Sequence, residues 1–180
     1  MSIRCEAGSR ERLPQGASEA QTDFASIIQQ IKADNYRGKR VRFQAFLKTT
    51  EAVGEGAALW FRVDGADFHP VAFDNMSEPD RMVRGTKDWK QYSIVLDVPT
   101  EAQILAYGAL LTGRGQVWID DASLEVVGKD VPETGAQEQI KIGLDAEFAK
   151  MPAEAKAAFI ENGEQGAQQS AAQPENLDFE

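Results

Sequence analysis

The sequence predicts an all-β fold, an antiparallel β-sandwich or barrel, and three observations indicate it. Several short segments alternate apolar and polar residues with the period of two expected for a half-buried strand. Turn-forming residues separate these segments, as in Val63–Asp67 and Thr112–Gly115. No amphipathic helix lies between most of them, so neighbouring strands should pair antiparallel. With 180 residues and 42% hydrophobic content, the chain can form one such domain and a tail.

Composition and charge narrow the classes of function. The formal net charge is −10, whereas nucleic-acid binding needs clusters of Lys and Arg to neutralise phosphates. Direct binding to nucleic acid or to an anionic membrane is therefore not expected. Cys5 is the only cysteine, which excludes an intrachain disulfide. The first residues lack the apolar run of a signal peptide and no window reaches the length of a membrane span, so we expect a cytoplasmic protein unless an export segment precedes this chain.

The expected strands follow one another from residue 39 to residue 127. KRVRFQAFLKT (39–49) places Val41, Phe43, Ala45 and Leu47 on one face and Arg40, Arg42, Gln44 and Lys48 on the other. ALWFRVDG (58–65) repeats the alternation. The further candidates are PVAFDNM (70–76), WKQYSIVLDVP (89–99), AQILAYGALLTG (102–113) and GQVWIDDASLEVV (115–127).

Two regions do not follow this alternation. FASIIQQIKADNY (24–36) has the spacing of an amphipathic helix, and local propensity slightly favours that helix over a strand. After Val127 the composition becomes rich in Ala, Glu, Gln and Gly. We expect 133–173 to be a flexible acidic and Ala-rich linker with a short helix, mostly disordered towards its end.

The strand segments together resemble the carbohydrate-binding-module-like jelly rolls of the galactose-binding-like superfamily. The resemblance rests on YRGKRVRFQAFLKT, ALWFRVDG, FDNM, RGTKDWKQYSIVLDVP and YGALLTGRGQVWIDDASLEVV. The chain is similar in particular to the version of this domain found as an accessory domain in bacterial AraC-type transcriptional regulators and in some enzymes. The resemblance implies a jelly-roll domain over residues 24–132, preceded by a partly ordered segment over 1–23. It also implies a strand over 24–33 in place of the helix, and a further strand at IRCEAG (3–8).

The end of the chain contains a motif that modules of this type usually carry at their start. Such modules open with a sequence like N-L-x-F-E, and here Asn176–Glu180 reads NLDFE. One interpretation is that residues 174–180 fold back as a returning strand, which a long linker allows at modest entropic cost. The other is that the motif marks where a second module once followed. Both interpretations stay open at this point.

Asp120 and Asp121 are neighbouring carboxylates in the last expected strand. Neighbouring residues of a regular strand point to opposite faces, so an acid/base pair is not expected. The resemblance implies a structural calcium ion with Asp120 and Glu180 among its ligands. Calcium takes six to eight oxygen ligands, and two carboxylates alone do not make such a site. The alternative is that Asp121 is a solvated edge residue and Asp120 bonds to a loop.

The polar face of the first two strands offers a candidate ligand site. Trp60 and Arg62 lie opposite the apolar face of their strand, and Arg42 and Gln44 are expected on the polar face of the neighbouring strand. Sugar rings stack their CH groups on aromatic rings while Arg and Gln bond the hydroxyls. The alternative is that Trp60 belongs to the core or its rim. Trp89 and Tyr92 are expected to be structural, and Trp118 fits either face.

No motif for catalysis is apparent. The chain has no Gly-x-Ser-x-Gly elbow, and His69, its only histidine, lies beside Pro70 in a turn and is expected at the surface. A non-catalytic binding or sensing module is therefore the leading hypothesis, for a carbohydrate, another small polar molecule or a protein partner. No helix-turn-helix pattern is visible, so the chain is not expected to be a complete regulator. The alternatives are a structural or oligomerisation domain and, less favoured, a fragment of a carbohydrate-active enzyme.

Overall fold

The computed structural model describes residues 3–7, 23–78, 80–135 and 137–174, with backbone only for 3–7. Within these described residues, six strands and two helices follow one another. The strands are β1 (Ile3–Ala7), β2 (Phe24–Lys32), β3 (Arg40–Asp64), β4 (Pro70–Asp74), β5 (Val83–Asp97) and β6 (Ile104–Val127). The helices are α1 (Gln137–Lys150) and α2 (Ala153–Gln169).

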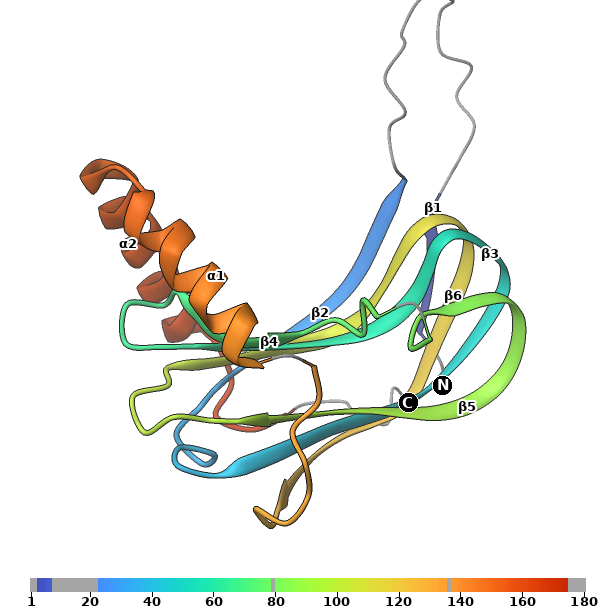
Figure 1. Cartoon of the computed structure of the whole chain (residues 1–180), viewed down its shortest axis with the longest axis horizontal. Helices are drawn as coiled ribbons and strands as arrows, with labels where there is room; N and C mark the ends of the chain where they lie inside the picture. The colour runs from blue at the N-terminus through green and yellow to red at the C-terminus, as the bar shows by residue number, and fades with distance from the viewer. Residues whose placement is uncertain (1–2, 8–22, 79, 136, 175–180) are drawn as a thin grey trace, which may run out of the picture.

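The strands form one antiparallel sheet that curls over into two layers (Figure 1). Layer A contains β2, the first half of β6, the second half of β3, and β4. Layer B contains β5, the first half of β3, the second half of β6, and β1. The expected all-β antiparallel sandwich is confirmed, and so are the strands at 24–32 and 3–7. Tertiary pairing of 24–32 with β6 decides against the helix that local propensity slightly favours.

β3 and β6 each run through both layers, where the sequence suggested two separate strands. The reason lies in glycines at the bends. Gly54, Gly56, Gly113 and Gly115 all have positive φ, and the register shifts beside them. The Thr112–Gly115 stretch is therefore a bend inside a paired strand and not a chain-reversing turn.

The core lies between the two layers. Phe43 of layer B packs against Phe61 and Tyr107 of layer A, with ring centroids 6.1 and 5.0 Å apart. All three side chains are buried, as are Val41, Ala45 and Leu47. The alternation of β3 therefore points its odd-numbered residues inward in both layers, and its even-numbered residues face away from the core.

Residues 134–172, which we call the helical strap, are tied to the sandwich at both ends. At the start, the Thr134 amide donates to the Val95 carbonyl of β5 (3.0 Å), and the Gln137 side chain bonds the backbone of Phe73 in β4. At the end, the Lys32 amide of β2 donates to the Ala171 carbonyl (2.9 Å). The strap thus runs from one edge of layer A to the other, and Figure 1 shows its helices on the layer A side.

The strap contains more helix than the short one that composition suggested, with 14 residues in α1 and 17 in α2. Neither helix contains a fully buried residue. Just beyond α2, Ala171 forms a parallel bridge with Ile31, and the Asn35 side chain donates to the Ala172 carbonyl. The chain therefore does return to the sandwich before residue 174. Beyond residue 174, the returning strand expected at 174–180 lies outside the described residues.

Candidate functional site

The four residues of the expected ligand site lie on two different faces. All four belong to β3, and not to two neighbouring strands as the sequence analysis expected. Arg42 and Gln44 lie in its first half and face outward from layer B. Trp60 and Arg62 lie in its second half and face outward from layer A. Because the two layers enclose the core between them, these outer faces point in opposite directions, and the expected single site does not form.

Trp60 offers little of its ring to a ligand. It is 8% exposed, and its indole Nε1–H donates to the Ser26 hydroxyl of β2 across β6 (3.2 Å). The β6 residue paired with Trp60 is Gly108. A Cβ at Gly108 would lie 1.9 Å from the Ile27 carbonyl oxygen, so β2 approaches β6 more closely than a side chain allows. The environment of Trp60 therefore agrees with the alternative that it is a structural aromatic at the rim of the core.

The outer face of layer B combines aromatic and polar side chains. Phe46 faces outward between the buried Ala45 and Leu47, and its strand partners are Gln91 of β5 and Asp120 of β6. Trp118 is the partner of Lys48, two residues after Phe46, and it also faces outward because Val117 and Ile119 are buried. We call Gln44, Phe46, Lys48, Gln91, Trp118 and Asp120 the layer B platform.

Gln44 and Arg42 extend this face towards the start of β3. Gln44 lies between Ser93 of β5 and Ser123 of β6, which gives it small polar neighbours on both sides. Arg42 pairs with Glu125 of β6, with Nη1 3.1 Å from Oε2. Sequence reasoning did not single out Phe46, although an aromatic residue among the polar positions 40, 42, 44 and 48 was a usable signal.

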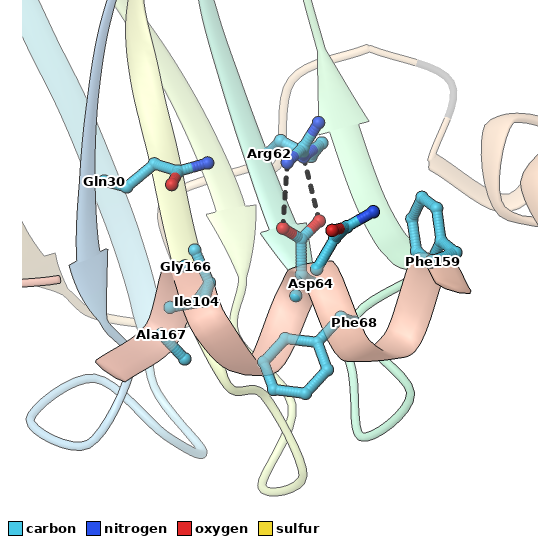
Figure 2. A pocket seen from close by; sticks show the side chains of 10 residues that line it. Gln30, Arg62, Asp64, Phe68, Ile104, Phe159, Gly166 and Ala167 are labelled. Carbon is cyan, nitrogen blue, oxygen red and sulfur yellow. Dashed lines mark hydrogen bonds and ion pairs between the residues drawn. The ribbon is translucent and has the colours of Figure 1, made fainter. Parts of the chain in front are cut away.

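Arg62 lies at the floor of a cleft between layer A and α2, shown in Figure 2. Its Nη2 donates to Asp64 Oδ2 (3.0 Å), and its Nε lies 2.8 Å from Asp64 Oδ1 without the alignment of a hydrogen bond. Asp64 is only 4% exposed. Burial raises the pKa of the Asp64 carboxyl, and the neighbouring Arg62 opposes this effect without cancelling it.

Asp120 and Asp121 do not obey strict strand alternation. The register of β6 against β3 shifts between Phe46 and Gln44, and Asp121 has a φ of 48°. This bulge adds one residue, so Ala122 takes the buried position and Asp121 is exposed. The expectation that the two carboxylates point to opposite faces is therefore wrong. The Asp121 amide donates to the Asp120 carboxylate (3.1 Å), so within the described residues Asp120 bonds to its own strand and not to a loop.

The described residues do not supply a calcium site. Among them, no three His, Cys, Asp or Glu side chains gather as a metal would require. Calcium takes six to eight oxygen ligands, and the acidic pair alone does not reach that number. Glu180, the other expected ligand, lies outside the described residues. A structural calcium ion at Asp120 and Glu180 stays a prediction.

His69 does not lie freely at the surface as the sequence suggested. Its ring stacks on Phe148 of α1 with centroids 4.5 Å apart, and Nε2 lies 3.2 Å from Asp145 Oδ1. Its side chain is 18% exposed. The docking of α1 onto the β3–β4 turn causes this burial, and the sequence gives no local signal for that contact. His69 thus helps to hold the strap.

Comparison with known proteins gives one relative in sequence. The chain is 41% identical over 135 residues to the uncharacterized HTH-type transcriptional regulator YbfP of Bacillus subtilis (strain 168). The match covers 71% of this chain and 45% of that protein, so the chain spans less than half the length of the relative. No family model matches the sequence.

Solved structures with a similar arrangement include a bacteriophage CBA120 tailspike enzymatically active domain, a CBM4 module and TmCBM61 in complex with β-1,4-galactotriose. The TM-scores are 0.43, 0.39 and 0.38, with identities of 13, 13 and 14%. The matches cover 71, 70 and 59% of this chain and 19, 78 and 65% of those chains. These scores are low, so the fold rests on the strand pairing itself.

No helix in the described part of the chain is long and apolar enough to cross a membrane.

Proposed function

We propose that this chain is a non-catalytic binding module whose ligand is a carbohydrate, bound on the layer B platform. The observation that carries the proposal is the outward position of Phe46 and Trp118 among Gln44, Gln91 and Asp120. An aromatic ring on a sheet face offers a flat apolar surface for the CH groups of a sugar ring. Amide and carboxylate groups beside it can bond the hydroxyls at the ring edge.

The proposed context is transcriptional regulation, with this module as the part that senses a ligand. The named relative is an HTH-type regulator, and this chain spans less than half of it. Nucleic acid is not the proposed ligand. α1 carries three acidic and two basic side chains and α2 three and one, so neither helix presents the basic surface that phosphates require. A protein partner that receives the signal is part of the proposal, and a cytoplasmic location stays a prediction.

The test is the binding of soluble hexasaccharides of glucose, xylose and galactose by titration calorimetry, with and without calcium. We expect at least one to bind and Phe46→Ala to weaken its binding at least about tenfold, the loss of roughly 1.4 kcal/mol. Phe24→Ala is the matched control, because Phe24 is an aromatic residue 64% exposed on layer A. Equal loss in both variants, or no binding to any of the sugars, would contradict the proposal.

A structural or oligomerisation role is the second candidate, and a specific observation favours it. Phe24 and Ile28 are 64 and 55% exposed on the same face of β2, an edge strand of layer A. A dimer using this surface would show a concentration-dependent sedimentation coefficient that Ile28→Lys abolishes. A monomer at all concentrations would exclude this role. An enzymatic role is the least favoured, since no arrangement of acidic side chains described above suits acid/base catalysis.

A further inference from the structure

A second and more enclosed place for a ligand lies under the helical strap. The cleft between α2 and the outer face of layer A has a volume of about 200 Å³. Figure 2 shows Gln30 and Ile104 on one side of the cleft and Phe159 on the other, with Arg62, Asp64 and Phe68 between them in this view. These residues come from three strands, a turn and a helix, so the cleft exists only while the strap is docked.

The floor of the cleft is polar but electrically balanced. Asp64 is 4% exposed and pairs with Arg62, whose side chain is 33% exposed. The guanidinium has five N–H donors. Nη2 donates to Asp64 and Nε lies beside it without a hydrogen bond, so the pair does not use the donors of Nη1. The Gln30 amide adds a donor and an acceptor to the lining. A charged ligand would add a charge that no other residue of the lining compensates, which is costly beside the buried Asp64, whereas a neutral ligand would not.

The remaining lining is apolar or small. Phe68, Phe159 and Ile104 supply apolar surface, and Gly163, Gly166 and Ala167 form the part of α2 that faces the sheet. The two glycines differ in their surroundings. A Cβ at Gly163 would lie 2.4 Å from Phe68, whereas a Cβ at Gly166 would meet only the Gln30 Oε1, at 3.9 Å. Close packing thus accounts for Gly163, and the space at Gly166 belongs to the cleft.

We propose that this cleft binds one small neutral molecule with several hydroxyl groups and an apolar face, about the size of a single sugar ring. Its hydroxyls would bond Arg62, Gln30 and the exposed Asn162, and its CH groups would contact Phe68 and Phe159. This site lies on the face opposite the layer B platform and does not depend on it. A ligand here contacts both strap and sandwich, so binding holds the strap in place.

The experiment uses the full chain and two-dimensional NMR, with D-glucose, D-galactose, D-xylose and myo-inositol as probes. We expect at least one probe to shift the backbone amides of Gly163 and Gly166. The charged analogues D-glucuronate and D-glucosamine should bind more weakly. Gly166→Leu places a side chain in the cleft and should weaken binding at least tenfold.

Gly143→Leu is the matched control, because Gly143 lies in α1 with no atom within 4 Å of its Cβ position. It should bind the probe like the wild type, and so should Phe46→Ala, which separates this site from the layer B platform. If circular dichroism shows that Gly166→Leu does not fold, Gly166→Ala should give a smaller loss in the same direction. The proposal is overturned if no neutral probe shifts the two glycine amides, or if the folded Gly166 variant keeps the wild-type affinity.

Discussion

At the scale of single residues, the buried Asp64 carboxyl makes stability depend on pH. Its pKa in the folded protein is raised above the ordinary value of 3.8 by burial, which outweighs Arg62. The folded state therefore binds this proton more readily than the unfolded state. The contribution of Asp64 to the free energy of unfolding is fully present below the ordinary pKa and is lost as pH rises through the raised pKa.

Asp64→Asn removes this titration and provides the test. We expect the difference in unfolding free energy, wild type minus Asp64→Asn, to fall as pH rises from acidic to neutral. Urea denaturation at a series of pH values measures it. For Asp97 the change of the unfolding free energy with pH has the opposite sign, because hydrogen bonding from Arg40 lowers its pKa. For Asp97→Asn the corresponding difference should rise with pH, and a slope of the same sign in both variants would contradict these assignments.

The backbone at Asp121 provides a second residue-scale prediction. Its φ of 48° lies in the left-handed region, which is unfavourable for residues other than Gly, Asn and Asp. We expect Asp121→Val to lower the free energy of unfolding by about 1–2 kcal/mol, and Asp121→Gly to leave it nearly unchanged. Ser123→Val is the control, since Ser123 is in regular pairing with Gln44. Equal effects of Val at both positions in urea denaturation would mean that the bulge is absent.

At the scale of elements, the glycines of the strap should respond differently to the same substitution. Gly143→Ala should stabilise the protein by about 0.5–1 kcal/mol, because alanine is the better helix former and the Cβ meets no atom. Gly163→Ala should destabilise it, because the new Cβ would lie 2.4 Å from Cβ and Cγ of Phe68.

Thermal unfolding followed by circular dichroism measures both changes. Compared with Phe68→Gly alone, the double variant Gly163→Ala/Phe68→Gly should recover part of the loss, because glycine removes both Cβ and Cγ of Phe68, the atoms that clash. If Gly163→Ala alone, with Phe68 still present, stabilised the protein, α2 would not pack on the β3–β4 turn.

The sequence allowed the individual strands to be predicted better than their continuity. The alternation around Phe43 and around Phe61 follows from local chemistry, since outward positions such as Arg42, Gln44 and Arg62 are polar. Whether Gly113 reverses the chain or bends a paired strand depends on which strand pairs with it. The residue pattern around Gly113 does not carry that information. For the same reason Arg42 and Trp60 were expected on neighbouring strands, whereas one bent strand carries them to opposite faces.

The strap escaped prediction for a different reason. α1 and α2 have no fully buried residue, so their sequence has no strong apolar periodicity to indicate docking. The contacts that hold them involve backbone groups at strand edges, such as the Lys32 amide and the Ala171 carbonyl. Backbone pairing of this kind is invisible in a residue pattern. Arg62 faces away from the core as the alternation predicted, but the cleft around it is created by the strap.

At the scale of the whole molecule, the continuity of β3 and β6 should make the two layers unfold together. Each strand contributes to both layers, so neither layer can lose it without disturbing the other. Phe43 lies in layer B and Phe61 in layer A, and both are in central positions of the sheet. Under native conditions we expect their amides to exchange with solvent hydrogen through the same opening, with equal free energies.

Gly113→Ala tests this coupling at the bend. A Cβ there would lie 2.0 Å from the Val53 carbonyl oxygen, and φ is +112°. We expect a loss of at least about 2 kcal/mol, and the same loss in the exchange free energies of the Phe43 and Phe61 amides. The amides of α2 serve as the control, because a helix without fully buried residues opens locally and should exchange at a lower free energy. A strand shared by both layers should transmit the strain to each of them. A loss of exchange free energy confined to one layer would therefore mean that the bend separates two independent units.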